Sequence, residues 1–190
     1  MLLRRDAVVI LLADRPPDLL TIAGLGSATY DLAAGDDARN FYLWGAMGGA
    51  LALGLGLARA QPSKRVLVLT GDGELLMGLA SLATVGVQAV QNLAVAVLDN
   101  EVYGETGGQA SHTAHGIELA AVARACRFRE AVTVRTPEAL GGLRDLLLHA
   151  PGPVLGVIKT AASEVPRVLP ERDGHVLRRR FRRAVLGERG

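Results

Sequence analysis

Two short polar turns could together bind a divalent cation. Asp72 stands between two glycines directly after the apolar run Arg65–Thr70, and Asn100 follows a second apolar run, Leu93–Asp99. One helix and one strand fill the interval between the two turns, so we expect both at the same edge of a parallel sheet, where such sheets bind ligands. An Asp carboxylate, an Asn carbonyl and a nearby main-chain carbonyl form an oxygen set suited to Mg²⁺, which completes its shell with phosphate and water.

The glycines around Asp72 indicate that an anion could approach the same turn. The helix that follows begins at Glu74 and presents free N–H groups at its first turn. Glycines also cluster in residues 24–29 and 54–58, where a dinucleotide loop is the alternative to consider. Neither segment has the full G-x-G-x-x-G pattern with an acidic residue about 20 positions further on, so we do not expect a nicotinamide site.

The order of apolar runs and helical patterns predicts the sheet that positions these turns. Short apolar strands separated by helices are typical of parallel β-α-β units with helices on both faces. The predicted strands are Leu19–Ala23, Arg65–Thr70, Leu93–Asp99, Ala131–Val134 and Val154–Thr160. The predicted helices are Met47–Arg59, Glu74–Val90, Ile117–Ala125 and Pro137–His149. We therefore expect an α/β fold with a doubly wound, mostly parallel sheet, in a domain of residues 1–165 followed by a basic helical tail, residues 166–190.

The composition favours a cytoplasmic domain with a sizeable core. Of the 190 residues 49% are hydrophobic and only 4% aromatic, so Ala, Leu and Val are expected to fill the core. The single cysteine, Cys126, excludes a disulfide within the chain, favours a reducing compartment and is interpreted as a core residue. No apolar stretch reaches the roughly 20 residues that span a bilayer, and the N-terminal apolar run lacks the small residues of a signal-peptide cleavage site.

The last 20 residues carry seven arginines against three acidic residues. Nucleic-acid binding is one interpretation of such a tail, but Phe181 is its only aromatic residue and no recognised binding motif accompanies it. The alternative is an amphipathic helix over His175–Leu186, because apolar residues recur there near helical spacing. We expect the helix and no nucleic-acid partner.

The two polar turns together resemble the fingerprint of enzymes that use thiamine diphosphate (ThDP). The segment reads GDGELLMGLASLATVGVQAVQNLAVAVLDN, with Asp99-Asn100 where the family usually has Asn-Asn. The resemblance implies the ThDP-binding fold and a Mg²⁺ ion held by Asp72, Asn100 and the carbonyl of Val102, which clamps the cofactor's diphosphate.

The segment Trp44–Gly49 is similar to a second element of this family. The resemblance implies that the Gly45 carbonyl accepts a bond from the aminopyrimidine and that Met47 bends the cofactor, while Ser27 contacts the diphosphate. Glu74 is a departure, since many relatives have Ser or another small residue there; we expect its carboxylate to turn away and its backbone N–H to make any contact. The full set of implied cofactor contacts is Ser27, Gly45, Met47, Gly71, Gly73, Glu74, Tyr103, Gly104 and Thr106.

The chain most resembles the small β subunits of sulfopyruvate decarboxylase and the matching half of phosphonopyruvate decarboxylase. The resemblance implies decarboxylation of a small 2-oxo acid, with the cofactor as electron sink. In the family, a glutamate on a separate pyrimidine-binding domain activates the aminopyrimidine, and this chain has room for only one domain. We therefore expect a partner subunit to supply this glutamate, in a hetero-oligomer with paired sites; the alternative is an uncommon self-assembly of this chain. Phe41, Tyr42 and Trp44 lie beside the cofactor element and are expected to form the apolar interface.

Other roles remain open at the level of sequence. His112 could handle protons or a substrate acid group, with a polar loop residue or a metal site shared with His115 as alternatives. Glu105 is either a substrate-facing carboxylate or a solvated charge. We assign both His112 and Glu105 as candidate catalytic residues. The alternatives for the whole chain are a ThDP-dependent lyase or oxidoreductase subunit that uses another acceptor, and a non-catalytic cofactor-binding scaffold.

Overall fold

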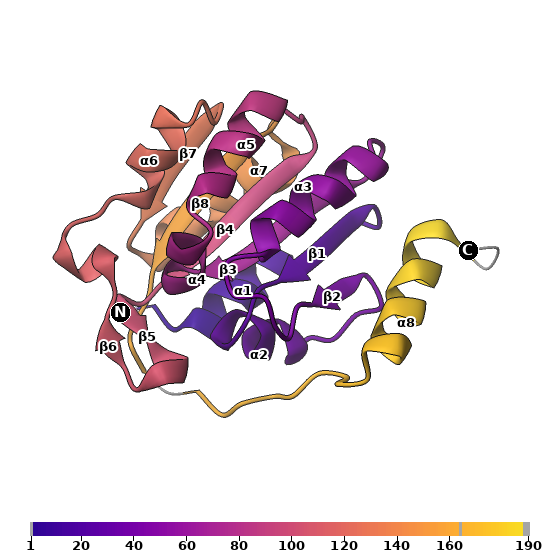
Figure 1. The fold of residues 1–190 in the computed structure, drawn as a ribbon, viewed down its shortest axis with the longest axis horizontal. Coiled ribbons are helices and arrows are strands. Elements are labelled where there is room, and N and C mark those ends of the chain that lie inside the picture. The colour runs from indigo at the N-terminus through magenta and orange to yellow at the C-terminus, as the bar shows by residue number, and fades with distance from the viewer. Residues whose placement is uncertain (1, 164, 188–190) are drawn as a thin grey trace.

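Six strands form one parallel sheet at the centre of the molecule (Figure 1). The computed structural model describes residues 2–163 and 165–187. The strand order is β2-β1-β3-β4-β8-β7, and every neighbouring pair is parallel. The strands are β1 (Leu19–Ala23), β2 (Asn40–Tyr42), β3 (Arg65–Gly71), β4 (Leu93–Asp99), β7 (Glu130–Val134) and β8 (Val154–Lys159). The order reverses between β1 and β3, which makes the sheet doubly wound and confirms the predicted fold class.

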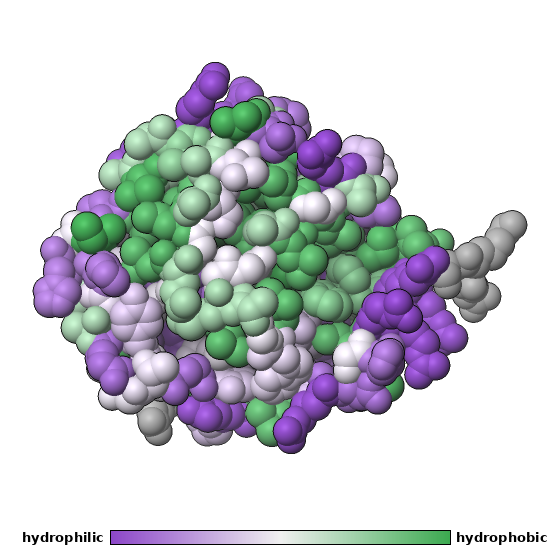
Figure 2. All heavy atoms as spheres, viewed as in Figure 1, coloured by the Kyte–Doolittle hydropathy of each residue, from purple (hydrophilic) through white to green (hydrophobic). Residues whose placement is uncertain are grey.

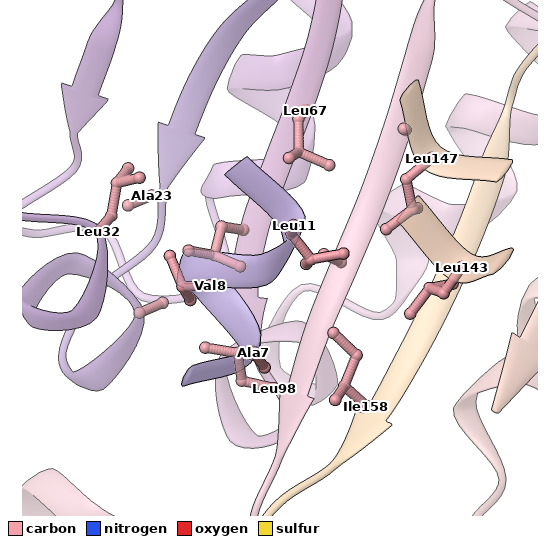
Figure 3. Packing of buried hydrophobic residues seen from close by; sticks show 14 of the residues in the cluster. Ala7, Val8, Leu11, Ala23, Leu32, Leu67, Leu98, Leu143, Leu147 and Ile158 are labelled. Carbon is pink, nitrogen blue, oxygen red and sulfur yellow. The ribbon is translucent and has the colours of Figure 1, made fainter. Parts of the chain in front are cut away.

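Helices cover both faces of this sheet and form two hydrophobic layers. On one face, Leu11, Leu67 and Leu143 meet in the layer that Figure 3 shows. Successive strand residues point to opposite faces, so Val66 and Val68 of β3 enter the other layer. The first face carries α1 (Arg4–Leu12), α2 (Ser27–Ala33) and α7 (Leu140–His149); the second carries α3 (Ala50–Ala60), α4 (Asp72–Met77), α5 (Ala80–Gln88) and α6 (Leu119–Ala125).

The predicted strands all form, with bounds that differ by at most one residue. The predicted helices differ more, because the single helix expected over 74–90 is two helices, α4 and α5. The break lies at Gly78, whose backbone packs on Gly48: a Cβ placed on Gly78 would lie 2.1 Å from the Gly48 oxygen. Helix α3 begins at Ala50, not at Met47, because Ala46 (φ +54°) and Gly48 (φ +88°) adopt left-handed conformations that a helix excludes.

Several short elements carried no clear sequence signal. Helices α1 and α2 and the edge strand β2 were not predicted, and neither was the small hairpin that follows β4. This hairpin pairs β5 (Val102–Tyr103) with β6 (Gln109–Ala110), and short 3₁₀ turns, η1 (Gly104–Thr106) and η2 (His112–His115), accompany it; a third, η3 (Pro137–Ala139), precedes α7. No helix among residues 2–163 and 165–187 is long and apolar enough to cross a membrane.

The C-terminal helix α8 (Gly174–Leu186) lies against the edge strand β2 (Figure 1). Its predicted start was one residue later, at His175, and the Asp173 carboxylate caps it by accepting from two backbone N–H groups. Arg180 donates to both carboxylate oxygens of Asp36, at 2.6 and 3.0 Å, and the Phe181 ring lies 5.4 Å from the Phe41 ring. The basic helix is therefore docked on the sheet edge.

This packing corrects the expectation for the aromatic residues of β2 and its following turn. Tyr42 is only 1% exposed, and its hydroxyl donates to Asp36 at 2.6 Å. Trp44 is half-buried, and its indole N–H donates to the Glu171 carbonyl at 3.1 Å. The chain's own C-terminal segment covers these rings, so the expectation that they form an open partner interface was wrong.

Candidate functional site

The turns that follow β1, β3 and β4 converge on one cavity beyond the carboxyl ends of the strands. This is where a doubly wound sheet binds ligands, since its strand order reverses between β1 and β3. The predicted site residues that line it are Ser27, Met47, Gly71, Asp72, Gly73, Glu74, Asn100, Val102, Tyr103, Gly104, Glu105 and Thr106. Gly45 and His112 are not in this lining.

Three groups that carry oxygen atoms meet in the cavity lining. One arm of the Asn100 side-chain amide lies 3.1 Å from the Val102 carbonyl oxygen and 3.2 Å from Asp72 Oδ1. With its NH₂ group in this place, Asn100 would donate to both oxygens. With its oxygen there, the three groups would present the hard donor set that Mg²⁺ prefers. The residues present therefore fit a divalent cation.

The carboxylate of Asp72 is oriented by two hydroxyl groups. Its Oδ2 accepts from Ser111 Oγ at 2.5 Å and from Thr113 Oγ1 at 3.2 Å, which leaves Oδ1 facing Asn100. Burial raises the pKa of Asp72, the two hydroxyls lower it, and the charge of Asp99 raises it further. A cation at Oδ1 would reverse this balance by favouring the ionised carboxylate.

Lys159 supports the turn that carries Asn100. Its ammonium lies 2.8 Å from Asp99 Oδ2 and 2.6 Å from Glu101 Oε1, so it contacts the residues on both sides of Asn100. Glu101 is in the left-handed region (φ +64°), a conformation that costs a non-glycine residue energy and needs outside support. Burial lowers the pKa of Lys159, but the hydrogen bonds to Asp99 and Glu101 outweigh it and the pKa is raised.

Glu74 turns its carboxylate into the protein. Oε2 accepts from the Thr70 hydroxyl at 2.6 Å, and the group lies directly against Gly24. Burial raises the pKa of Glu74, while the Thr70 hydroxyl and nearby backbone N–H groups lower it. The side chain is only 4% exposed, so Glu74 contributes mainly backbone to the cavity.

The hairpin after β4 covers one side of the cavity. The Tyr103 ring packs on Gly73, where a Cβ would lie 2.6 Å from the ring, and the Tyr103 hydroxyl lies 3.1 Å from His112 Nδ1. His112 is exposed, so it stands outside the cavity behind Tyr103. Glu105 lies beside Gly26, and its carboxylate is 4.0 Å from Arg167.

Of the remaining predicted contacts, Met47 and Ser27 line the cavity and Gly45 does not. Met47 is half-buried, whereas Gly45, two residues before it, is exposed and apart from the lining. Ser27 begins α2 and is half-buried, directly after Gly26 (φ +78°).

Sequence reasoning missed four residues that shape the site. Ser111, Thr113 and Lys159 hold the ligand turns, and Arg4 of α1 lines the cavity while its Nε lies 3.2 Å from Asp31. Ser111 and Thr113 could have been predicted, because they place a hydroxyl group on each side of His112 in the sequence. Arg4 and Lys159 are far from the motif in sequence and had none.

Comparison with known families decides what kind of cavity this is. Residues 22–156 match the family model of the thiamine pyrophosphate enzyme C-terminal TPP binding domain. The chain belongs to this family. The matched range contains every predicted site residue, and it implies that thiamine diphosphate is the cofactor. The predicted ThDP-binding fold and the predicted relationship to ThDP enzymes are both confirmed.

Named relatives of this ThDP-binding chain are decarboxylases. It is 42% identical over 156 residues to a phosphonopyruvate decarboxylase of Streptomyces viridochromogenes. The matched region covers 80% of this chain and 38% of the relative. It is 35% identical over 191 residues to sulfopyruvate decarboxylase subunit beta of Methanothermobacter thermautotrophicus, which covers 98% of each. The chain thus spans less than half of the first relative and nearly all of the second.

Solved structures of ThDP proteins share the fold. A thiamin diphosphate-dependent enzyme from Mycobacterium smegmatis superposes with a TM-score of 0.70 at 20% identity, over 85% of this chain and 32% of that one. At this identity the likeness concerns the fold alone.

Proposed function

We propose that the chain is the β-type subunit of a heteromeric ThDP-dependent 2-oxo-acid decarboxylase, acting on sulfopyruvate, phosphonopyruvate or a similar acid. The observation that carries the proposal is the meeting of the Asp72 carboxylate, the Asn100 amide and the Val102 carbonyl in a cavity bounded by glycine-rich turns. The near-complete coverage of a named beta subunit supports the subunit type.

In this proposal Asp72, Asn100 and the Val102 carbonyl hold Mg²⁺, and Ser111 and Thr113 orient Asp72 for it. When bound, ThDP supplies the electron sink for loss of carbon dioxide. The chain anchors the cofactor's diphosphate by the Ser27 hydroxyl and by backbone groups at its turns, namely those of Gly71, Gly73, Glu74, Tyr103, Gly104 and Thr106.

The residues nearer the cofactor's rings are proposed to set its shape and surroundings. Met47 lines the cavity and would be the apolar side chain that contacts the cofactor's rings, and the Gly45 carbonyl would accept from the aminopyrimidine. His112 and Glu105 remain our candidates for proton handling and for contact with the substrate acid group. Support for His112 comes from its bond to Tyr103, which itself lines the cavity, whereas Glu105 lines the cavity directly.

The partner subunit is proposed to bind the face that carries α3, α4 and α5. Figure 2 shows apolar surface spread over this face. Leu53 of α3, Met77 of α4 and Val87 of α5 are 38%, 63% and 70% exposed, although helices of this composition normally bury such side chains. Large exposed apolar patches mark interaction sites, and this one adjoins the turn that carries Met47. We therefore assign to this face the contact with the subunit that supplies the activating glutamate.

We further propose that residues 1–165 form the cofactor-binding domain and that the basic segment 166–190 is an addition to it. The docking of α8 on β2 supports a packing role for this segment rather than a nucleic-acid contact.

The proposed function is tested by reconstitution with a candidate partner subunit that carries a pyrimidine-binding domain. We expect the mixture, with ThDP and Mg²⁺, to release carbon dioxide and the corresponding aldehyde from sulfopyruvate or phosphonopyruvate in equal amounts. Transfer of the product to a second acceptor instead would identify a different ThDP-dependent lyase or oxidoreductase. Cofactor binding without turnover on any 2-oxo acid would favour a scaffold, and either result would overturn the decarboxylase proposal.

A further inference from the structure

The proposed cofactor site is assembled from three segments that are separate in the chain. They are the loop after β1 (Gly24–Ser27), the turn before α3 (Gly45–Gly49) and the turn after β3 (Gly71–Gly73). Sheet pairing aligns β1 with β3, but it ends at the strands and leaves the positions of the turns to other contacts. A group that contacts all three segments would fix them relative to one another.

The Glu74 side chain lies at the point where these segments meet. It begins in α4, directly after the segment Gly71–Gly73, and its carboxylate lies against Gly24 of the loop after β1. Backbone N–H groups of Leu25, Gly48 and Ala50 lower the pKa of this carboxyl, which places them near it. Oε1 is buried and has no hydrogen-bond partner among residues 2–163 and 165–187. Oε2 is fixed by the Thr70 hydroxyl at 2.6 Å.

Gly24 provides the space that this carboxylate occupies. A Cβ placed on Gly24 would lie 1.5 Å from Glu74 Oε2 and 2.3 Å from Cδ, which no side chain could tolerate without movement of the carboxylate. The φ of Gly24 is outside the left-handed region, so alanine would fit the backbone there, and the three atoms nearest to its Cβ all belong to the Glu74 carboxylate. The buried carboxylate of Glu74 therefore requires a residue without a side chain at position 24.

The carboxylate also lies near the start of helix α3, where backbone N–H groups lack a side-chain acceptor. This helix has 11 residues and begins after Gly49, which has no side chain to accept from the first N–H groups. Unpaired N–H groups and the positive end of the helix dipole favour a negative group at this position. Glu74 is the acidic side chain near this end of the helix, since the Ala50 N–H lowers the pKa of its carboxyl.

We infer that Glu74 is a positioning residue that joins the three cofactor-binding segments and sets the placement of Met47 and the diphosphate loop relative to Asp72. The inference rests on the proposed cofactor site for its functional part. Its structural part concerns the chain alone and can be tested without cofactor.

The first test is a double-mutant cycle on the cofactor-free chain. We expect Gly24→Ala to lower the midpoint of thermal unfolding by roughly 5 °C or more, because the new methyl group displaces the carboxylate. In a Glu74→Ser background the same change should cost less than about 2 °C, since the space is then free. Gly35→Ala is the matched control, because nothing lies within 4 Å of its Cβ, and it should leave the midpoint unchanged. An equal cost of Gly24→Ala in both backgrounds would overturn the inference.

The second test measures amide hydrogen exchange in Glu74→Gln, with Glu74→Ser as the alternative should Gln prevent folding. We expect the amides of Leu25, Gly48 and Ala50 to exchange roughly tenfold faster, because one of the two carboxyl oxygens near them becomes an NH₂ group that cannot accept from them. Glu130→Gln, at the opposite edge of the sheet, should change none of the three. Unchanged exchange at these amides in the Glu74 variant would contradict the positioning role.

The functional part is read from Mg²⁺-dependent ThDP affinity in the same variants. We expect Glu74→Gln to weaken it roughly tenfold, as segments that must converge on one ligand become loose. An affinity within twofold of the parent's would overturn the positioning role. If the parent itself bound no ThDP while the thermal cycle and the exchange behaved as expected, the proposed cofactor site would fail and the structural role of Glu74 would stand.

Discussion

Replacement of Asp72 by alanine is expected to weaken Mg²⁺-dependent ThDP binding by at least about 100-fold. Of the three groups that meet in the cavity, only that of Asp72 carries a formal charge, since Asn100 and the Val102 carbonyl are neutral. Mg²⁺ depends on carboxylate ligands in protein sites, and removal of the sole carboxylate leaves two neutral oxygens to hold it. The diphosphate then loses the ion through which it is clamped.

The same replacement should leave the fold intact. Ser111 and Thr113, which bond Asp72, lie 2.8 Å apart and can bond each other, and Thr113 keeps its contact with Asp99 at 2.8 Å. Burial disfavours the Asp72 charge, so its loss also removes a destabilising element. We expect the thermal midpoint to change by no more than a few degrees, roughly the effect of 1 kcal/mol in a chain of this size.

Calorimetric titration with ThDP in excess Mg²⁺ tests this prediction, with the candidate partner present in all samples. Asp145→Ala, an exposed position on α7 at the far face, is the matched control and should bind as the parent does. A variant without Asp72 that binds ThDP as tightly as the parent at equal Mg²⁺ would refute the metal assignment.

Introduction of a charge on the apolar face is expected to abolish association with the partner. Met77→Asp places a carboxylate on a side chain that is 63% exposed, at the end of α4 and next to α5. Burial of an unpaired charge in an interface costs several kcal/mol, so we expect the dissociation constant to rise by at least about 100-fold. The isolated chain should keep its stability, because the new carboxylate is solvated there.

Val9→Asp is the control for this prediction. Val9 of α1 is 61% exposed, nearly as much as Met77, but it lies on the opposite face of the sheet. Sedimentation or calorimetry with the partner should show normal association for Val9→Asp and none for Met77→Asp. The reverse result would move the interface to the α1 face.

The parts of the fold that sequence predicted best are those in which local pattern and tertiary environment agree. β1 is apolar except for Thr21, β4 is apolar up to its last residue, Asp99, and both are buried on both faces, so composition marks their limits. The spacing of Asp72 and Asn100 also sufficed to place them together, because parallel strands one helix apart end at the same edge.

Features that depend on distant contacts could not be predicted in this way. The break between α4 and α5 comes from the approach of Gly48 to Gly78, 30 positions away, and helix periodicity continues through it. Lys159 meets Asp99 only because β8 pairs with β4.

The prediction that Phe41, Tyr42 and Trp44 form the partner interface was wrong because it, too, depended on a distant contact. An amphipathic tail helix was foreseen, but nothing in its sequence specified that Phe181 and Arg180 would dock on β2 and cover Phe41 and Tyr42. The partner surface that we propose instead consists of aliphatic residues on α3, α4 and α5.

The most direct test of the account is the activity of the pure chain. Its central claim is that these residues hold the metal and diphosphate, while the glutamate that activates the aminopyrimidine belongs to another subunit. The chain, purified without a partner and saturated with ThDP and Mg²⁺, is assayed for carbon dioxide release from several 2-oxo acids, including sulfopyruvate and phosphonopyruvate. We predict no release above the uncatalysed rate until the partner is added. Sustained turnover by the pure chain would contradict the account, because it would require the activating carboxylate to lie within these 190 residues.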